Sequence, residues 1–523
     1  MENKKKYFIT TAIPYASKKP HIGNTYEIIL TDAIARFKKM QGFEVLFCTG
    51  VDEHGQKIEE LAKKEKTNPE EYAKKISGII KNIWDKMDCC YDIFIRTTEN
   101  HHVKAVQNIF KKLQDKGDIY KDSYEGWYCT PCESFWTNSQ LVDGKCPECN
   151  REVKKTKETA YFLKVGKYQK KLLEHMEKNK DFLIPNFYTD EIINNFLKPG
   201  LLDFCITRNT FKWGIPVESD PEFIIYVWLD ALINYITALE YDTESQNEKF
   251  KKFWPADLQI VGKDILRFHA TIWPIILMML DIPLPKHILV HQWLLYKDGK
   301  MSKSSGNVVY ADDLADIFSV DTVRFYVLKS MSLDHDGSIS YENLISVYNT
   351  DLANTVGNLT KRVCDMICKY FEGSIDNFDL SNDDKLEKLG LETKEEYLNL
   401  MEKYELSEAI SKILKFAREC NKYIDEKAPW VIAKDETKKS ELKEILFNLI
   451  ESIRFIAVML KPIIPKTAEE ILKQISAKEQ DFNSLKKFNE SKKEIKIEKP
   501  EIIFKRIEPE EKLKEIEENL NKK

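Results

Sequence analysis

Hydrophobic and polar positions in the first 117 residues follow two periods that alternate along the chain. Apolar runs at 7–13 and 44–49 predict β-strands, and apolar residues at helical spacing follow at 25–40 and in segments that begin at Gln56 and His101. Strands and helices in alternation are typical of an α/β fold with a parallel, doubly wound sheet of the Rossmann type. Residues 1–117 are therefore predicted to form the first half of such a sheet.

The same alternation returns after an interruption. Between residues 118 and 222 the pattern changes to short strands with one helical piece at 167–178, which is typical of an insertion. Three apolar runs within residues 223–295 then predict the strands that complete the sheet, at 223–229, 258–261 and 287–290.

Helical spacing dominates the rest of the chain. Beyond residue 340 no strand pattern continues, and periodic segments at 386–404, 408–424 and 442–460 predict an α-helical bundle within residues 356–523. From Lys478 onward Lys and Glu alternate with few apolar anchors, so we expect a solvated helix or a loosely docked tail and assign it no function.

Length and charge limit the function without naming it. A chain of 523 residues can form several cores, and 80 Lys and Arg against 85 Asp and Glu give a net charge of −5. A nucleic-acid surface would therefore have to be a local patch. The sequence has neither a run of about 20 apolar residues nor the apolar core of a signal peptide, so we expect a cytoplasmic protein with no membrane segment.

Four of the eleven cysteines have the spacing of metal ligands. Cys129 and Cys132 form one Cys-x-x-Cys pair and Cys146 and Cys149 a second, with 13 residues between the pairs. Four thiolates bind Zn²⁺ tetrahedrally and leave no open coordination position, so we predict one structural zinc ion per chain. The alternative is two chance pairs of free thiols in a reducing compartment.

Two segments carry the donors and positive charge that a nucleoside triphosphate needs. The segment His21-Ile-Gly-Asn24 follows the first strand and opens a helical pattern, so backbone N–H groups at a helix start would face an anion, and Gly23 allows close approach. The segment Lys300-Met-Ser-Lys-Ser304 follows an apolar run and a turn at 297–299. Taken alone, this second segment is equally compatible with a solvated turn.

The two segments resemble the two signatures of class I aminoacyl-tRNA synthetases, and the whole chain resembles the methionyl-tRNA synthetase family. Besides the cysteine pairs, the resemblance rests on motifs in a fixed order, at 12–15, 50–55, 226–231, 262–264, 268–269, 300–304 and 428–430. It implies a Rossmann-type catalytic domain with a zinc-bearing connective insertion, a stem-contact region at 296–355 and a C-terminal helical anticodon-binding domain.

The resemblance also implies a two-step reaction. L-Methionine and ATP, with Mg²⁺, give methionyl adenylate and pyrophosphate, and the methionyl group then passes to the terminal ribose of tRNA(Met), initiator or elongator. The residues implied for phosphate chemistry are His21, Asn24, Lys300 and Lys303, and those against ATP are Gly23, Gly262, Asp264 and again Lys303. Asn24 stands where many class I enzymes have a second histidine, and an amide donates a hydrogen bond without adding charge.

For the amino acid, Asp52 resembles the acceptor of the α-ammonium group, against the alternative of a solvated carboxylate. The implied side-chain pocket is largely aromatic and consists of Ile13, Tyr15, Trp228, Ala231, Leu232, Tyr235, Phe268 and His269. Periodicity alone would assign such residues to the core. A thioether needs a narrow aromatic slot and a weak donor, which Tyr235 and His269 are expected to supply. Leu232 and Phe204 stand where proline and tryptophan also occur.

For tRNA, Trp430 after Pro429 resembles the anticodon-reading element, with Asn421 on the preceding helix and Arg362 as a second contact. An indole can stack on an unpaired base. The alternative is that Pro429 starts a helix and Trp430 fills the core of the bundle.

Rival functions share some of these features. Synthetases for leucine, isoleucine, valine or cysteine would share both signatures, but the branched-chain enzymes need a large editing insertion and the cysteine enzymes place zinc in the active site. A non-catalytic tRNA- or nucleotide-binding relative is opposed by the intact Lys300 and Lys303. No appended RNA-binding or dimerisation domain is apparent, so we expect a monomer.

Overall fold

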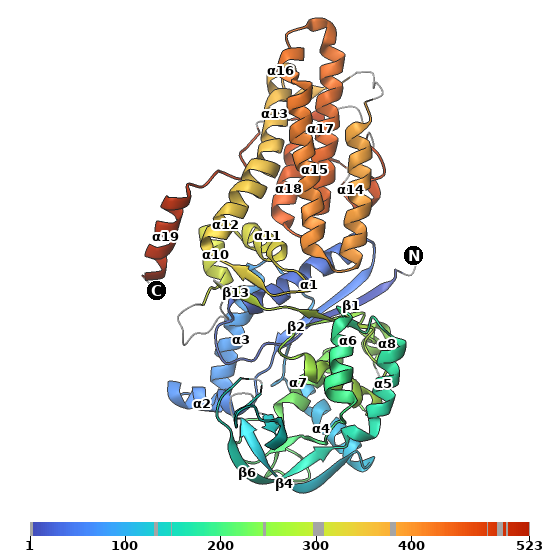
Figure 1. Cartoon of the computed structure of the whole chain (residues 1–523), viewed down its shortest axis with the longest axis vertical. Coiled ribbons are helices and arrows are strands. Elements are labelled where there is room, and N and C mark those ends of the chain that lie inside the picture. Colours follow the sequence, from blue (N-terminus) through green and yellow to red (C-terminus); the bar gives the residue numbers. More distant parts are fainter. Residues whose placement is uncertain are drawn as a thin grey trace.

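A parallel sheet lies between a tall helical bundle and a smaller β-rich region in the computed structural model (Figure 1). The structure describes residues 4–129, 134–136, 138–147, 149–243, 247–296, 308–376, 383–478, 480–488, 495–497 and 500–521. The sheet has the order β3-β2-β1-β11-β12-β7, and all its pairs are parallel. The strands are β1 (Lys6–Thr11), β2 (Glu44–Val51), β3 (Ile93–Arg96), β7 (Leu183–Ile184), β11 (Leu258–Gly262) and β12 (His287–His291). The strand order proceeds outward from β1 through β2 to β3 on one side and from β11 to β12 on the other, so the order changes direction between β1 and β11. This arrangement confirms the predicted doubly wound fold.

Helices cover both faces of this sheet. Successive residues of β1 point to opposite faces, so Tyr7 and Ile9 enter one core and Phe8 the other. The first core includes α1 (Ile22–Met40), α2 (Gln56–Glu65) and α3 (Pro69–Lys86). The second includes α4 (Asn100–Asp115), α5 (Gln169–Lys178), α6 (Phe187–Ile192), α7 (Val227–Thr237), α8 (Glu248–Phe253), the π-helix η4 (Phe268–Ile272) and α9 (Trp273–Met279).

The sheet differs from the prediction in three strands, and one of them is β3, which has no counterpart among the predicted strands. The apolar run 223–229 is not a strand of the main sheet, because only β10 (Ile224–Ile225) is extended and it pairs antiparallel with β9 (Thr207–Arg208). Helix α7 begins directly afterwards at Val227 and is buried nearly all round, so its sequence shows no period that separates it from a strand. The sixth strand, β7, instead comes from within the segment expected to be an insertion.

A second, antiparallel sheet occupies the opposite end of the molecule from the bundle (Figure 1). Its order is β5-β4-β6-β8, with β4 (Ile119–Cys129), β5 (Ser134–Trp136), β6 (Lys154–Leu163) and β8 (Phe204–Cys205). The long pairing of β4 with β6 places the cysteine region at the far end of this ribbon.

The predicted bundle is confirmed, and small strands flank it. Its helices are α13 (Asn358–Phe371), α14 (Lys385–Glu402), α15 (Leu406–Lys427), α16 (Pro429–Ile432), α17 (Lys439–Leu460) and α18 (Pro465–Gln474). Preceding it in the chain are α10 (Ala311–Ile317), α11 (Val320–Ser330), α12 (Tyr341–Val347) and the π-helix η5 (Tyr348–Gly357). Strand β13 (Leu294–Tyr296) pairs with β14 (Gly337–Ile339), and β15 (Ser374–Ile375) with β16 (Ile495–Lys496). The last pair was not expected, since two-residue strands leave no periodic signal. In the part of the chain that the structure describes, no helix is suited to crossing a bilayer.

The C-terminal tail docks through a few contacts. It ends in α19 (Pro509–Asn521), which lies against α12 (Figure 1). The Tyr348 hydroxyl donates to the Lys505 carbonyl at 3.0 Å, and Asn349 exchanges two hydrogen bonds with the backbone of Ile507. Phe504 is buried against Tyr348. The expected charged tail is therefore anchored by its few apolar and backbone groups.

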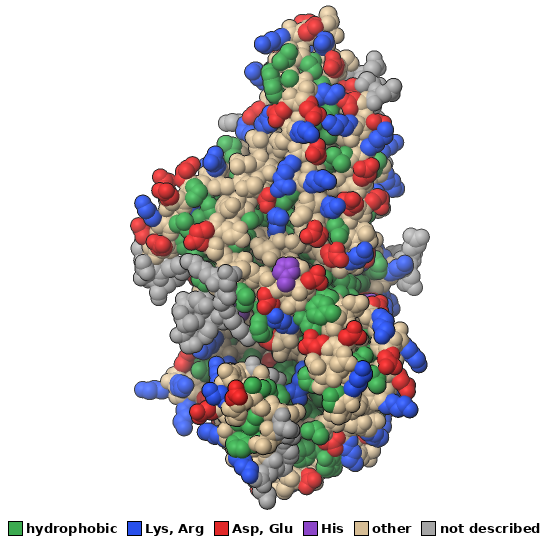
Figure 2. Space-filling model, in the orientation of Figure 1, with side chains coloured by type: hydrophobic (Ala, Val, Ile, Leu, Met, Phe, Trp, Pro, Cys, Tyr) green, Lys and Arg blue, Asp and Glu red, His purple; other side chains and the backbone are tan. Residues whose placement is uncertain are grey.

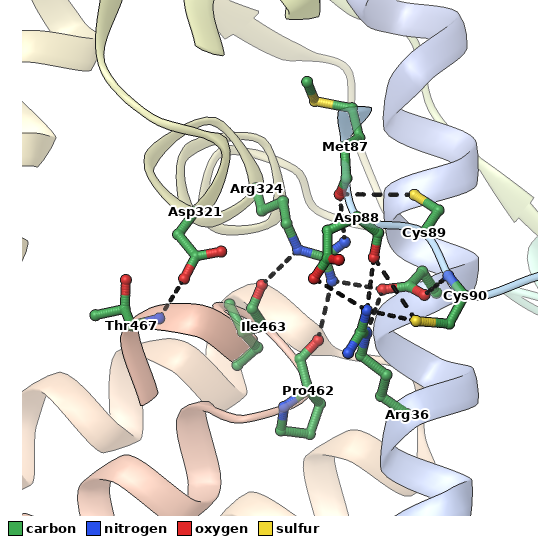
Figure 3. Close-up of polar contacts among 11 residues, drawn as sticks. Arg36, Met87, Asp88, Cys89, Cys90, Asp321, Arg324, Pro462, Ile463 and Thr467 are labelled. Atoms are coloured by element: carbon green, nitrogen blue, oxygen red, sulfur yellow. Dashed lines mark hydrogen bonds and ion pairs between the residues drawn. The ribbon is translucent and has the colours of Figure 1, made fainter. Parts of the chain in front are cut away.

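The buried guanidinium of Arg324 on α11 bonds to both the bundle and the N-terminal α/β region (Figure 3). Its Nη2 donates to Asp32 Oδ2 on α1 at 2.7 Å. Three main-chain carbonyls accept its remaining bonds: Met87 at 3.1 Å, Pro462 at 3.2 Å and Ile463 at 2.9 Å. Asp321, one turn earlier on α11, accepts from the Thr467 N–H at 2.6 Å. A single side chain thus connects α1, the segment after α3 and the turn between α17 and α18.

Replacing Arg324 with methionine should destabilise the protein by about 3–5 kcal/mol, because the Asp32 carboxylate and three carbonyls would lose their buried partner. The control is Lys111→Met, which breaks an ion pair with Asp115 whose side chains are 67% and 65% exposed. That change should cost under about 1 kcal/mol. Urea denaturation followed by tryptophan fluorescence measures both, and equal stabilities of the two variants would contradict the role assigned to Arg324.

Candidate functional site

The segments after β1 and β2 are bonded to each other at the carboxyl edge of the sheet. The Asp52 N–H donates to the Pro14 carbonyl at 3.0 Å, and the Ala16 N–H donates to the Asp52 carbonyl at 2.8 Å. Asp52, at 8% exposure, is thereby paired with Tyr15. Gly50 in β2 permits the close approach of β3, since a Cβ there would lie 2.2 Å from the carbonyl oxygen of Ile95. The structure therefore places Tyr15 beside Asp52, and Ile13 packs against the core on the other face of the sheet.

The start of α1 is held by its own first residues. The Gly23 N–H donates to His21 Nδ1 at 3.1 Å, and the His21 N–H donates to Asn24 Oδ1 at 3.2 Å, which forms a capping box. Because Nδ1 is the acceptor, the neutral His21 ring carries its proton on Nε2. The amide oxygen of exposed Asn24 is used in the cap, so its NH₂ group is the part that can face a ligand.

The chain just after the second predicted phosphate segment lies beside the first segment. Lys300 and Lys303 lie outside the described residues, but the chain just beyond them is fixed, because the Ile22 N–H donates to the Val309 carbonyl at 2.8 Å. The first turn of α1 and the segment that follows the lysines are therefore neighbours.

Several polar side chains lie close together at the carboxyl ends of β11 and β12. His291 Nε2 lies 3.0 Å from Glu27 Oε2, and a Cβ on Gly262 would lie 2.7 Å from Asp264 Oδ1 and 3.4 Å from His291 Nε2. Burial alone would lower the pKa of His291, but its hydrogen bond to Glu27 raises it. Gly262 and Asp264 are site residues expected from the sequence, whereas Glu27 and His291 were not expected. A glutamate within the apolar pattern of residues 25–40 was the available signal.

Six of the eight residues expected to form an amino-acid pocket come from two helices. Helix α7 places Trp228, Ala231, Leu232 and Tyr235 at helical spacing along one side, and η4 places Phe268 and His269 opposite them. Trp228 stacks on Phe268 with ring centroids 3.9 Å apart and an interplanar angle of 13°. Trp228 and Ala231 remain partly exposed, and Leu232, Tyr235, Phe268 and His269 are buried.

Tyr235 and His269 bind each other in this arrangement. The Tyr235 hydroxyl lies 2.8 Å from His269 Nε2, and His269 Nδ1 lies 3.0 Å from the Ile265 carbonyl. Since a carbonyl only accepts, Nδ1 carries the proton and the tyrosine hydroxyl donates to Nε2. Burial lowers the pKa of His269 to about 4, so the ring is neutral near pH 7. For the Tyr235 hydroxyl to donate to a thioether, as predicted, its hydrogen bond to His269 would have to break.

Three of the four predicted zinc ligands meet at one point. The Sγ atoms of Cys129, Cys146 and Cys149 all lie within 4.8 Å of one another, and those of Cys129 and Cys149 are 3.5 Å apart. Tetrahedral Zn–S bonds of about 2.3 Å need sulfur atoms roughly 3.8 Å apart, so this donor set fits the ion. Cys132 lies outside the described residues.

The predicted tRNA residues occupy different settings at the far end of the bundle. Trp430 is 43% exposed, which opposes the core alternative, and it lines a surface hollow of about 260 Å³ with Arg362, Asp365, Met366, Lys369 and Tyr370. Asn421 does not line the hollow, because its amide donates to the Thr355 and Ala417 carbonyls at 3.2 Å. On the face shown in Figure 2, acidic and basic side chains are interspersed over the bundle. The exposed indole, rather than a block of positive charge, distinguishes this hollow.

Comparison with known proteins accounts for these sites together. A family described as class I (M) tRNA synthetases matches residues 7–159 and 150–364, and the anticodon-binding domain of methionyl-tRNA ligase matches residues 381–521. This chain belongs to the methionine group of class I tRNA synthetases. Methionine–tRNA ligase of Clostridium acetobutylicum is 49% identical over 99% of this chain and 80% of the relative, and that of Clostridium perfringens is 50% identical over 98% and 80%.

A solved structure of the same family supports the architecture. Mycobacterium tuberculosis methionyl-tRNA synthetase in complex with methionyl-adenylate has a TM-score of 0.90 and 35% identity, covering 96% of this chain and 100% of that one. Its apo form has a TM-score of 0.84 and 33% identity, covering 97% and 99%.

Within this family, Phe204 is the departure that the structure explains. Its ring lies 5.9 Å from that of Phe268 and 5.7 Å from that of Tyr226, both between centroids. Phe204 thus supports the outer side of the Trp228–Phe268 stack.

Proposed function

We propose that this chain uses ATP to convert L-methionine into methionyl adenylate and transfers the methionyl group to the terminal ribose of tRNA(Met), initiator and elongator, releasing pyrophosphate and AMP. The observation that carries the proposal is the match over nearly the whole chain to a methionyl-tRNA synthetase that holds methionyl-adenylate. Because one chain carries every proposed site, we take the monomer, in the cytoplasm, as the working unit.

In the first step the methionine carboxylate attacks the α-phosphorus of ATP. We assign Asp52 to the α-ammonium group and the Trp228–Phe268 side of the pocket to the side chain. Holding both ends of the amino acid aligns its carboxylate for in-line attack. The carboxylate is already ionised at neutral pH, so little general acid–base work is needed.

Charge develops on phosphate oxygens during that attack. We assign His21 Nε2–H, the Asn24 amide, Lys300 and Lys303 to this charge, and Gly262 and Asp264 to the ATP ribose. Donors aimed where charge develops stabilise the transition state more than the ground state. Mg²⁺ bound to ATP would screen the phosphate oxygens when present.

The remaining assignments concern metal and tRNA. We assign Cys129, Cys132, Cys146 and Cys149 to one Zn²⁺, whose closed coordination makes it structural. Residues 118–222 would form the connective insertion between the two catalytic halves, 1–117 and 223–295. Residues 296–355 would contact the tRNA stem, and 356–523 would read the anticodon through Trp430 and Arg362, with Asn421 shaping the helix behind them.

Amino-acid-dependent exchange of pyrophosphate into ATP tests the chemistry. Methionine should support exchange, and leucine and cysteine should not. Because one transition-state donor is worth about 2.7–4 kcal/mol, Lys303→Ala should slow adenylate formation by about 10²–10³-fold with little change in methionine affinity. Lys297→Ala, in the same segment, is the control and should change the rate little. An unimpaired Lys303→Ala enzyme, or equal exchange with leucine, would refute the assignment.

Metal analysis tests the cysteine cluster independently of activity. The purified chain should contain one zinc ion. Cys146→Ser should lose this ion, because removal of one thiolate from a four-thiolate site greatly weakens zinc binding. Cys90→Ser, which changes an exposed cysteine elsewhere, should keep its zinc. Equal zinc contents in the two variants would rule out this ligand set.

Trp430→Ala separates tRNA recognition from chemistry. Loss of a stacking contact worth about 1–3 kcal/mol should lower aminoacylation at limiting tRNA by roughly one to two orders of magnitude, and pyrophosphate exchange should be unchanged. The control is Val431→Ala, whose side chain is 56% exposed beside it. A variant with normal tRNA affinity and a lowered melting temperature would show that Trp430 is structural.

A further inference from the structure

A buried carboxylate lies directly behind the proposed methionine pocket. Asp230 has no solvent exposure, and its two oxygens lie 2.7 Å from His54 Nδ1 and 2.7 Å from His102 Nε2. A carboxylate only accepts hydrogen bonds, so each imidazole nitrogen must be the donor. His102 Nδ1 in turn lies 2.7 Å from the Thr237 hydroxyl oxygen.

These side chains connect separate parts of the site. His54 follows Asp52 by two residues on the segment after β2, and Asp230 lies on α7 between Trp228 and Ala231. The Asp230–His54 bond therefore joins the residue assigned to the α-ammonium group with the helix assigned to the methionine side chain. His102, from α4, holds Asp230 from the opposite side.

The segment that carries His54 is itself rigidly held. Glu53 is fully buried and accepts from Arg96 Nε at 2.8 Å, and its own N–H donates to Thr97 Oγ1 at 3.0 Å. The Trp213 indole donates to the Glu53 carbonyl at 2.6 Å and lies 5.3 Å from the His54 ring. These contacts restrain the segment, so the Asp230–His54 bond ties α7 to a held point.

The negative charge of Asp230 strengthens its hydrogen bonds to the two imidazoles. Burial alone would raise the pKa of Asp230, but the two imidazoles outweigh it and lower the pKa, so the group remains ionised. Hydrogen bonds to an ionised acceptor are shorter and stronger than neutral ones, and they hold a geometry that apolar packing would leave looser.

We propose that Asp230 is a positioning residue that, through His54, sets the distance between the Asp52 carboxylate and the Trp228–Phe268 slot, and thereby the side-chain length that the site accepts. This inference rests on the proposed function, in which methionine is the substrate. Neither Asp230 nor His54 needs to touch the amino acid.

Two changes should break the connection, and two should preserve it. His54→Ala and Asp230→Ala each remove one partner. His54→Asn retains a donor, because the asparagine amide nitrogen occupies nearly the position of imidazole Nδ1. Thr237→Val alters the same buried cluster without removing either partner of Asp230.

Pyrophosphate exchange by the full chain should be measured with L-methionine, L-ethionine, whose side chain is one methylene longer, and L-norvaline, whose side chain is one atom shorter. In the two broken variants KM for methionine should rise, with KM for ATP within about twofold of the unaltered chain. The methionine-to-ethionine ratio of kcat/KM should fall about tenfold or more, since a methylene is worth about 10–200-fold in a fitted pocket. His54→Asn and Thr237→Val should keep the original ratio.

Folded broken variants with the original ratio would overturn the proposal, and so would a His54→Asn variant that discriminates as poorly as His54→Ala. Thermal melting establishes that each variant is folded, and His54→Ala alone decides the matter if Asp230→Ala does not fold. Failure of the unaltered chain to use methionine would instead refute the proposed function.

Discussion

The buried guanidinium of Arg324 fixes how the two halves of the molecule sit on each other. A planar group with five N–H donors can satisfy one carboxylate and several carbonyls at once, which an ammonium group cannot do in the same geometry. Here the carboxylate, Asp32, belongs to the helix that begins at His21, and two of the carbonyls belong to the turn after α17. This contact therefore helps to set the orientation of α1 relative to the bundle, together with the bond between Lys38 on α1 and Glu402.

Most of the fold could be predicted from the sequence, because in most helices and strands the spacing of hydrophobic residues matches the face that is buried. The strands β1, β2, β11 and β12 and the long bundle helices lie close to their expected positions. Prediction failed at α7, where burial on all sides erases the helical period, and at β7, whose two residues are too short for a pattern. The failure at α7 arises because periodicity reports exposure contrast and not backbone conformation, and the failure at β7 arises from the length of the strand.

Site residues were recognisable from the sequence only where they form contiguous motifs. Asp52 and Tyr15 were expected near each other and are paired, and three predicted metal ligands meet. Glu27 was missed because a single acidic residue on a helix carries no motif. The hydrogen bond between Tyr235 and His269 was also beyond sequence reasoning, since a pairing across 34 residues is a property of tertiary packing.

Gly50, in the motif at residues 50–55 that contains Asp52, is required by the close spacing of two strands and not by the chemistry of the site. Any side chain there would meet the backbone of β3 at Ile95, so the close approach of two strands, and with it the position of the segment that follows, depends on a hydrogen atom in place of a methyl group. Transplanting this acidic segment into another α/β scaffold would consequently require the neighbouring strand to come along with it. The transferable unit is a pair of strands, and the charged residues alone would lose their alignment.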